Sequence, residues 1–497
     1  MGFTANEYDQ GADPLIVEKA DNPSTRWSPL LWHACSFDPT IFLDVMLNLV
    51  RNPNINTSWL SRADILHDEQ GDQCFGPQQP QGDDLPRMPV FDSFECKRYL
   101  IRKLVPRNAS RDDPLDQTCL IYQSSLADGE EKTLVVYLPH VSSEEDIPFY
   151  HPKVRGIAFL HDWKAVNSQG SISISYLFFP GSALSTRLNR TALGLLSVVS
   201  RHGHGRQLGY VKRVQHDVLV PRVPFQDRYA ALKQKYARPL IAGWAESTDP
   251  RKHVFEDLGI AAFLIELWAE MYADSPFPGF VDIGCGNGLL VYILNQEGYL
   301  GWGFDARARK SWQSYNTQVH ISADPQDSLK QLVLVPSVVQ PEASSSPSAS
   351  PDAREAIIHD GLFAEGTFII SNHADELTPW TPVLAAISQC PFVMIPCCSH
   401  NLTGSKFRAP PPKDATKSIS TYSSLVSWVT GLANDCGWEI ETEMLRIPST
   451  RNTALVGRKR SAASSSLDST QIVQKYGGTG GYLANAMKLA KTAPRGH

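Results

Sequence analysis

Hydrophobic and polar positions follow two different patterns on either side of residue 220. Before it, short apolar runs succeed one another, and residues 171–177 alternate strictly between polar and apolar side chains. Strict alternation is typical of a strand with one buried face. A series of strands without intervening helices favours an antiparallel or mixed sheet, so we expect an N-terminal α+β domain over residues 23–220.

After residue 220, helix-like and strand-like segments alternate. Thr248-Asp249-Pro250 predicts the start of a helix, because proline is well tolerated in the first turn. Further segments fit short strands or helices, namely 279–283, 289–297, 301–304, 319–321, 367–371, 392–396 and 454–456. This alternation predicts an α/β domain with a mostly parallel, doubly wound sheet over residues 221–460.

Three segments lack the composition of a packed core. Residues 1–22 are polar and residues 461–497 are rich in serine and glycine, so we expect a flexible tail at each end. Residues 341–351 are almost entirely serine, alanine and proline. We therefore expect 326–364 to form mostly a disordered surface insertion, although the apolar residues 332–335 could pack.

The most informative pattern is Phe-Val-Asp-Ile-Gly-Cys-Gly-Asn-Gly-Leu-Leu at 280–290. A buried strand ends in an acid, a turn follows with three alternate glycines, and a helix begins. Glycine lets the backbone approach a ligand closely because it has no side chain. A second acid, Asp305, closes the next apolar run, where nucleotide-binding folds hold ribose hydroxyls. A glycine-rich turn without a ligand is the alternative interpretation.

The spacing Asp-x-Gly-x-Gly-x-Gly resembles motif I of the S-adenosylmethionine (SAM) methyltransferases, and Leu289 stands where a dinucleotide-binding loop has its third glycine. The resemblance implies a Rossmann-like fold with SAM as the cofactor. The loop amides and the following helix would face the amino-acid end of SAM. Asp324 would bind the adenine amino group, or serve only as a turn acid before Pro325. The implied cofactor-binding residues are Asp282, Gly284, Cys285, Gly286, Asn287, Gly288, Asp305 and Asp324.

Two polar clusters follow later strands, at the strand ends where an open α/β sheet places its ligands. The first cluster concentrates groups that handle protons, namely Asn372, His373, Asp375 and Glu376. Its acids could instead open a helix, because negative charge is favoured at a helix N-terminus. The second cluster contains Lys406 and the adjacent Cys397 and Cys398. Adjacent cysteines near one histidine rarely supply the four ligands of structural zinc, so we expect no metal.

Composition narrows the class of protein. The chain has 497 residues, which favours two domains, and its 42% hydrophobic and 20% charged residues are ordinary for a soluble protein. Nine scattered cysteines without a C-x-x-C pair indicate reduced thiols in a cytosolic or nuclear setting. The N-terminus lacks a secretion signature, and no run approaches the ~20 apolar residues of a membrane span. We expect a cytoplasmic protein.

The net charge of −6 coexists with local basic stretches. One stretch crowds six cations together, namely Lys97, Arg98, Arg102, Lys103, Arg107 and Arg111. Residues 201–206, Arg-His-Gly-His-Gly-Arg, fit a basic loop better than a metal site. Such stretches in an acidic protein favour an anionic partner.

Several stretches together resemble the fungal and animal tRNA (uracil-2′-O-)-methyltransferase family. Besides the motif at 282–290, they are Gly-Phe-Asp-Ala-Arg-Ala-Arg-Lys-Ser-Trp at 303–312, Ser-Asn-His-Ala-Asp-Glu-Leu-Thr-Pro-Trp at 371–380, Ile-Pro-Cys-Cys-Ser at 395–399, and upstream motifs at 101–107, 114–119 and 255–262. The resemblance covers residues 60 to 460 and therefore includes the N-terminal domain.

The resemblance implies a SAM-dependent enzyme that methylates the 2′-oxygen of uridine 44 in serine tRNA, with tRNA bound by the N-terminal domain. In-line methyl transfer needs chiefly alignment, and a positioned base helps a poorly nucleophilic hydroxyl. We expect His373, Asp375 or Glu376 to accept the proton, and Lys406 or Asn372 to orient the ribose. The alternatives are a SAM methyltransferase acting on a protein or small molecule, and a non-catalytic RNA-binding partner.

Overall fold

The chain folds as two units, Met1–Lys212 and Arg213–His497. The computed structural model describes residues 3–9, 11–19, 25–71, 88–108, 111–125, 130–210, 216–320, 325–339, 358–414, 419–461 and 468–491. The contacts divide the chain eight residues before the boundary at 220 that the hydrophobic pattern indicates.

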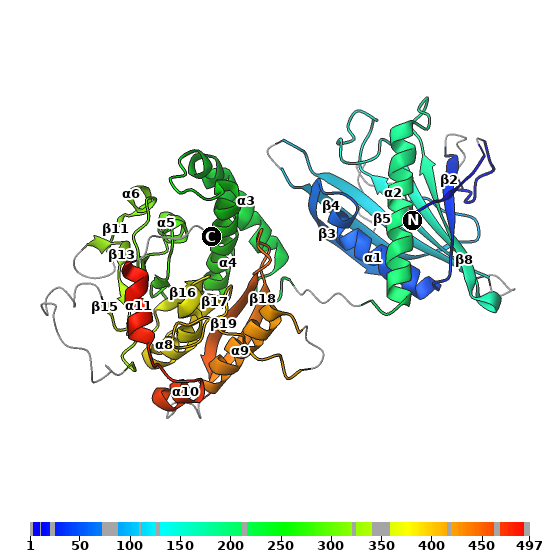
Figure 1. The fold of residues 1–497 in the computed structure, drawn as a ribbon. Helices are drawn as coiled ribbons and strands as arrows, with labels where there is room; N and C mark the ends of the chain where they lie inside the picture. Colours follow the sequence, from blue (N-terminus) through cyan, green and yellow to red (C-terminus); the bar gives the residue numbers. More distant parts are fainter. Residues whose placement is uncertain are drawn as a thin grey trace, which may run out of the picture. The chain divides into compact units, whose positions relative to one another are not determined.

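The N-terminal unit is built on one eight-stranded sheet in the order β1-β2-β8-β7-β6-β5-β4-β3 (Figure 1). Every neighbouring pair is antiparallel, which confirms the α+β prediction. The strands are β1 (Asn6–Glu7), β2 (Trp27–Cys35), β3 (Leu60–Gln70), β4 (Glu95–Pro106), β5 (Leu115–Ser125), β6 (Glu130–Pro139), β7 (Gly156–Lys164) and β8 (Gln169–Leu177).

Two helices, α1 (Pro39–Arg51) and α2 (Thr186–Gln207), share one hydrophobic core with this sheet. Side chains cap both helix starts, Asp38 at α1 and Ser185 at α2, because the first amides of a helix lack partners within it. The predicted basic loop at 201–206 is wrong, since these residues form the last turns of α2. Gly203 lies against the ring of Phe37, where an added Cβ would come within 2.4 Å, so close packing explains a glycine inside this helix.

The predicted flexible tail at residues 1–22 is also partly wrong. Strand β1 pairs with β2, Ile16 is 3% exposed, and Glu18 forms an isolated bridge with Phe91. A few apolar residues therefore anchor a segment whose composition is otherwise polar.

The C-terminal unit contains a seven-stranded sheet in the order β13-β10-β9-β16-β17-β19-β18. Strands β13, β10, β9, β16 and β17 are mutually parallel, and β19 runs antiparallel between β17 and β18. The parallel core agrees with the alternation of segments in the sequence. The strands are β9 (Phe280–Ile283), β10 (Gly301–Asp305), β13 (Leu329–Gln331), β16 (Phe368–Asn372), β17 (Phe392–Ile395), β18 (Trp438–Met444) and β19 (Thr453–Arg460).

Helices cover both faces of this sheet (Figure 1). On one face pack α3 (Arg222–Ala242), α4 (Pro250–Met271) and α5 (Leu289–Gln296). On the other face pack α8 (Thr381–Ser388), α9 (Thr421–Asp435), α10 (Ser469–Lys475) and α11 (Tyr482–Lys491). Successive strand residues alternate between the two cores, as Phe280 and Val281 do in β9. The predicted start of α4 is confirmed, because Asp249 caps it and Pro250 lies in its first turn.

The prediction of a surface insertion over 326–364 is wrong for part of that range. Residues 329–331 form edge strand β13 of the main sheet, and β14 (Val333–Leu334) pairs with β15 (Ile358–His359). Of the predicted strand at 319–321, Val319 lies in β11 (Gln318–Val319), which pairs with β12 (Gln326–Asp327) outside the main sheet, and Ile321 lies outside the described residues. Residues 340–357, which include the serine-rich run, lie outside the described part of the chain.

The prediction of a flexible tail over 461–497 is wrong for helices α10 and α11. Tyr482 opens α11 and is 1% exposed; its hydroxyl donates to the carbonyl of Leu334 at 2.9 Å, and its ring centroid lies 5.3 Å from that of Trp380. One amphipathic face is therefore enough to pack this polar, glycine-rich segment against the core of the C-terminal unit.

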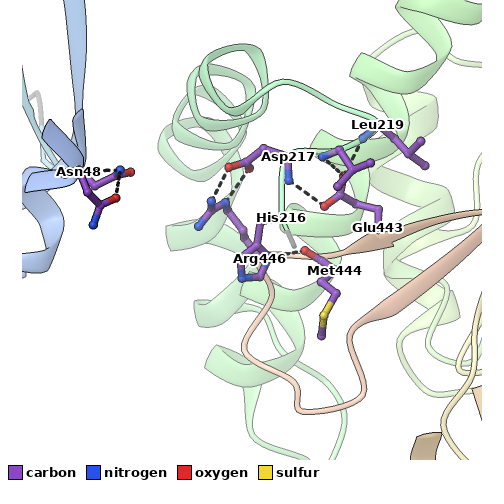
Figure 2. A network of polar contacts seen from close by, with 9 residues as sticks. Asn48, His216, Asp217, Leu219, Glu443, Met444 and Arg446 are labelled. Carbon is purple, nitrogen blue, oxygen red and sulfur yellow. Dashed lines mark hydrogen bonds and ion pairs between the residues drawn. The ribbon is translucent and has the colours of Figure 1, made fainter. Parts of the chain in front are cut away.

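Glu443, near the end of β18, holds the first described residues of the C-terminal unit (Figure 2). Its carboxylate accepts hydrogen bonds from the amides of Asp217, Val218 and Leu219 at 2.9, 2.7 and 2.8 Å. The carboxylate of Asp217 in turn accepts from Arg446, 2.9 Å from Nε. Asp217 adopts φ +66°, so side-chain contacts hold the chain in a conformation that non-glycine residues rarely adopt.

Replacing Glu443 with alanine should therefore destabilise the C-terminal unit. Three amides lose a charged acceptor, and we expect the free energy of unfolding to fall by about 2–4 kcal/mol in Glu443→Ala. Denaturant unfolding of the full chain measures this change. Glu439→Ala is the matched control, because Glu439 lies exposed on the same strand; equal effects of the two substitutions would contradict the proposed anchoring.

Candidate cofactor and catalytic site

The glycine turn lies at the carboxyl end of central strand β9. Gly284, Gly286 and Gly288 all have positive φ, at +73°, +54° and +76°. A Cβ on Gly284 would lie 3.1 Å from Cβ of Ala374, and a Cβ on Gly288 would lie 2.5 Å from the Leu329 side chain. A Cβ on Gly286 would meet nothing within 4 Å, so the turn presents bare backbone to open space at this residue.

Neighbouring groups fix the turn in place. Asp305, at the end of β10, accepts a hydrogen bond from the amide of Gly286 at 3.2 Å. Trp312 donates from its ring nitrogen to the carbonyl of Gly286 at 2.9 Å, and Ser311 donates to that of Asn287 at 2.8 Å. The loop conformation is thus set by side chains from the segment that follows β10.

Most amides of the turn are already used within the protein. Those of Gly284 and Cys285 donate to the carbonyl of Phe304, that of Gly286 to Asp305, and that of Gly288 to the carbonyl of Cys285. These four amides are therefore not free to donate to a ligand in this conformation, which contradicts for them the prediction that the loop amides face SAM. The turn instead lets a ligand approach the backbone closely at Gly286.

Two of the predicted cofactor side chains serve the fold. Cys285 is buried in the core with α4 and α5, and its Cβ would lie 2.8 Å from a Cβ on Gly303. Asn287 Oδ1 accepts from the amide of Leu289 at 2.8 Å and so satisfies the first turn of α5. Asp324 lies outside the described residues, so its roles as an adenine ligand or as a turn acid both stay predictions.

Two acids at this edge fit a polar ligand such as SAM. Asp282 is 2% exposed, and its Oδ1 has no hydrogen-bond partner among the described residues. Burial, followed by the charges of Asp257 and Asp305, raises the pKa of Asp282 well above its ordinary value. Asp305 accepts from the amides of Gly286 and Arg307, which leaves acceptor sites on its carboxylate for ribose hydroxyls.

His373 and Glu256 form a pair that the sequence alone does not indicate. His373 follows β16, and its Nε2 lies 3.2 Å from Oε1 of Glu256 on α4. Burial raises the pKa of Glu256, but the hydrogen bond and charge of His373 outweigh that effect and bring the pKa below its usual value. His373 Nδ1 is enclosed without a partner among the described residues, so neither ring nitrogen is open to a substrate in this conformation.

The other two acids of this cluster have different environments. Asp375 Oδ1 accepts from the thiol of Cys397 at 3.1 Å. Burial and, after it, Asp375 raise the pKa of that thiol far above its ordinary value. Burial raises the pKa of Glu376 to about 7, and the negative charges of Asp375 and Asp305 add to the rise. Glu376 therefore combines a carboxylate with the proton affinity that a general base needs near neutral pH.

The cluster after β17 meets the cluster after β16. Potential metal-ligand atoms of Asp375, Cys397 and Cys398 lie within 4.8 Å of one another. These residues supply three ligands, whereas a structural zinc site takes four. Lys406 is exposed and forms an isolated bridge with His400. Asn372 Oδ1 is enclosed without a partner among the described residues. The acids at 375–376 begin a 3-10 helix, which confirms the structural interpretation of that motif, and the chemical interpretation stays a prediction.

A cavity of about 420 Å³ lies at the opposite end of the strands and does not coincide with these residues. Its lining includes Tyr272, Gly366, Pro391 and Trp438, which precede or flank the strands rather than follow them. Enclosed polar atoms and acids with shifted pKa values, which are typical of functional sites, gather at the glycine turn and not at this cavity. Across the described ranges, helices long and apolar enough to cross a membrane are absent.

Comparison with known proteins matches both units. A family model described as "TRM44-like, N-terminal bet v1-like domain" matches residues 6–213, and one described as "Predicted AdoMet-dependent methyltransferase" matches residues 219–334. The first assigns the antiparallel sheet with its long helix to a Bet v1-like domain. AdoMet is SAM, so the second supports the cofactor predicted from the glycine turn.

Relatives match over nearly the whole chain. A tRNA (uracil-O(2)-)-methyltransferase of Neurospora crassa is 58% identical, covering 99% of this chain and 98% of the relative. Proteins of the same name from Schizosaccharomyces pombe and Yarrowia lipolytica are 41% and 39% identical, each covering 95% of this chain and 94% and 97% of the relative. The resemblance seen in the sequence is confirmed: the chain belongs to the tRNA (uracil-O(2)-)-methyltransferase family and is a SAM-dependent methyltransferase.

Proposed function

We propose that this enzyme transfers the methyl group of SAM to the 2′-oxygen of uridine 44 in serine tRNA. The names of its relatives supply the tRNA and uracil parts of this proposal. The observation that carries it is the convergence of a glycine turn, Asp305 and the polar cluster after β16 at one edge of a parallel sheet. We further propose that the C-terminal unit is a Rossmann-like methyltransferase fold, in which this edge holds the cofactor and the acceptor.

The proposed cofactor contacts follow from the fit of the turn. Gly286 admits the amino-acid end of SAM against bare backbone, with Gly284 and Gly288 setting the shape of the turn. Asp305 accepts from the ribose hydroxyls, and the enclosed oxygen of Asp282 lies at the strand end beneath them. When bound, SAM supplies a methyl group that is already activated by its sulfonium. The protein then has chiefly to align and deprotonate the acceptor.

Glu376 is the proposed proton acceptor among the three candidates. A ribose hydroxyl is a poor nucleophile while protonated, and a carboxylate with a pKa of about 7 can take its proton near neutral pH. Asp375 is engaged with Cys397, and both ring nitrogens of His373 are occupied or enclosed. Glu256 and His373 would instead hold the loop after β16 in position, with Asn372 and Lys406 orienting the ribose.

The decisive experiment is methyl transfer from labelled SAM into total tRNA that lacks this modification, followed by nucleoside and sequence analysis. We expect 2′-O-methyluridine confined to position 44 of serine tRNA. A labelled protein or small molecule in place of tRNA would move the assignment to another acceptor. Retention of SAM without any transfer would leave a cofactor-binding protein and overturn the proposed reaction.

Asp305→Ala tests the cofactor site. The substitution removes a charged acceptor from two hydroxyls, so we expect affinity for S-adenosylhomocysteine to fall roughly 10- to 100-fold. Titration calorimetry measures the affinity, and Asp274→Ala, an exposed acid of the same unit, is the control. Asp305→Asn keeps an oxygen that can accept from the amide of Gly286. It therefore distinguishes loss of a direct contact with the ligand from loss of the loop conformation. Unchanged affinity in both variants would contradict the assignment.

Glu376→Gln tests the proton acceptor through the pH profile. Only the deprotonated carboxylate acts as a base, so wild-type kcat should rise with pH through about 7 and level off above it. In Glu376→Gln we expect kcat to fall roughly 10²- to 10⁴-fold and this acid limb to disappear.

Two further variants make this test specific. Glu365→Gln alters an exposed acid just before β16, the strand that Glu376 follows, and should leave the pH profile of kcat unchanged. His373→Asn should lower activity while keeping the limb near pH 7, because it disturbs the loop rather than the base. A limb that survives in Glu376→Gln and vanishes in His373→Asn would transfer the role to His373.

A further inference from the structure

The crowded basic stretch of the N-terminal unit is not one surface. Arg98 forms a bidentate ion pair with Asp68, at 2.7 Å for each bond. Arg102 is buried and donates to Gln117 and to the carbonyls of Leu49 and Val50, which end α1. These cations serve the fold. The stretch leaves exposed arginines only at its far end, at Arg107 and Arg111.

Those two arginines lie beside an exposed aromatic pair. Trp59 is 49% exposed and Phe149 is 40% exposed, and their ring centroids lie 4.9 Å apart, edge to face. The guanidinium of Arg111 lies 5.3 Å from the Trp59 ring centroid and 5.5 Å from that of Phe149. Trp59, Phe149 and Arg111 form what we term the aromatic–arginine cluster.

Surrounding contacts hold this cluster rigid. The amide of Arg107 donates to the carbonyl of Trp59 at 2.9 Å, and Arg187 on α2 donates to the carbonyl of Phe149 at 2.8 Å. Asp112, which is buried, accepts two bonds from Arg111 at 3.0 and 3.1 Å and fixes the plane of its guanidinium. The backbone at both rings and the plane of the guanidinium are therefore held in place, which lowers the entropy lost when a ligand binds.

The kind of occupant follows from these groups. An isolated exposed aromatic residue needs no explanation, but two adjacent rings with a guanidinium over them offer flat surfaces to another flat group. Unpaired nucleobases stack on aromatic rings and on arginine planes, whereas paired bases within a helix do not expose their faces. Arg107 and Arg187 add positive charge beside the rings, which suits a phosphate backbone better than an apolar protein surface.

We propose that the aromatic–arginine cluster is an RNA-binding surface that stacks an unpaired base of the tRNA substrate. The inference rests on the proposed function for its substrate, and it adds where and how the N-terminal unit holds that substrate. The cluster contributes to tRNA affinity and takes no part in the methyl-transfer step.

The test compares Trp59→Ala with Trp59→Phe in the full-length protein. Loss of one stacking partner weakens single-stranded nucleic-acid binding by about 5- to 100-fold, and we expect this change in Kd and KM for tRNA in Trp59→Ala. Trp59→Phe keeps a ring and should stay within about 5-fold of wild type. SAM affinity and kcat at saturating tRNA should not change. Val166→Ala, another exposed apolar residue of this unit, is the control.

Salt dependence separates stacking from simple charge attraction. Trp59 meets no phosphate, so Trp59→Ala should lower tRNA affinity at every salt concentration and leave the slope of log K against log salt unchanged. Arg111→Lys keeps the charge and loses the plane, and should weaken tRNA binding although net charge is constant. An unaltered tRNA affinity in both variants overturns the proposal.

Two other outcomes have distinct meanings. If Trp59→Ala changes the molar mass in light scattering while leaving tRNA affinity unchanged, the cluster is an interface between copies of this chain and the proposal falls. Binding of tRNA is measured directly, without methylation. A wild-type protein that binds tRNA through Trp59 but methylates another acceptor would therefore refute the proposed function alone. A protein that methylates serine tRNA, but whose Kd and KM for tRNA are unchanged in Trp59→Ala, would refute this inference alone.

Discussion

The pairing of β9 between β10 and β16 is the constraint on which the site depends. In register, Asp282 pairs with Gly303 on one side and Ile370 on the other. Parallel strands end at the same edge, so Asp305 and Asn372, each two residues further along, emerge beside the glycine turn. Segments that are far apart in the sequence therefore contribute neighbouring groups, and the hydrogen bond from Gly286 to Asp305 is a direct result of that register.

This arrangement is unfavourable for the fold taken alone. Buried carboxylates accumulate at one edge, where Asp257, Asp282 and Glu376 all have raised pKa values because burial disfavours their charged forms. His373 and Asp375 have positive φ, at +52° and +45°. Strain and unpartnered polar atoms persist where the surrounding structure holds them, here two hydrophobic cores on opposite faces of the sheet. Such a gathering at the strand ends is typical of functional sites and supports the proposed position of the cofactor and the acceptor.

The parts predicted correctly from the sequence are those fixed by adjacent residues. The conformation of the glycine turn, the end of β10 at Asp305 and the capped start of α4 each follow from local rules on glycine, strand ends and helix caps. The contact between Glu256 and His373 cannot be predicted from the sequence, because the two residues are 117 positions apart and neither local sequence indicates it. Likewise composition predicts an insertion and a tail where the structure has β13 and α11, because composition is averaged over a window whereas one buried residue such as Tyr482 can anchor a helix.

The basic stretch of the N-terminal unit shows the same difference between composition and position. Six cations in fifteen residues favour an anionic partner on charge alone, but a strand turns successive side chains to opposite faces. Arg102 thus points into the core and caps α1, while Arg111, beyond the strand end, reaches the surface. A recognition surface is therefore distinguished by the groups that surround an exposed cation, not by the number of cations in a stretch. Arg111 lies against two exposed rings and a buried acid that fixes its plane, a combination that favours stacking over diffuse attraction.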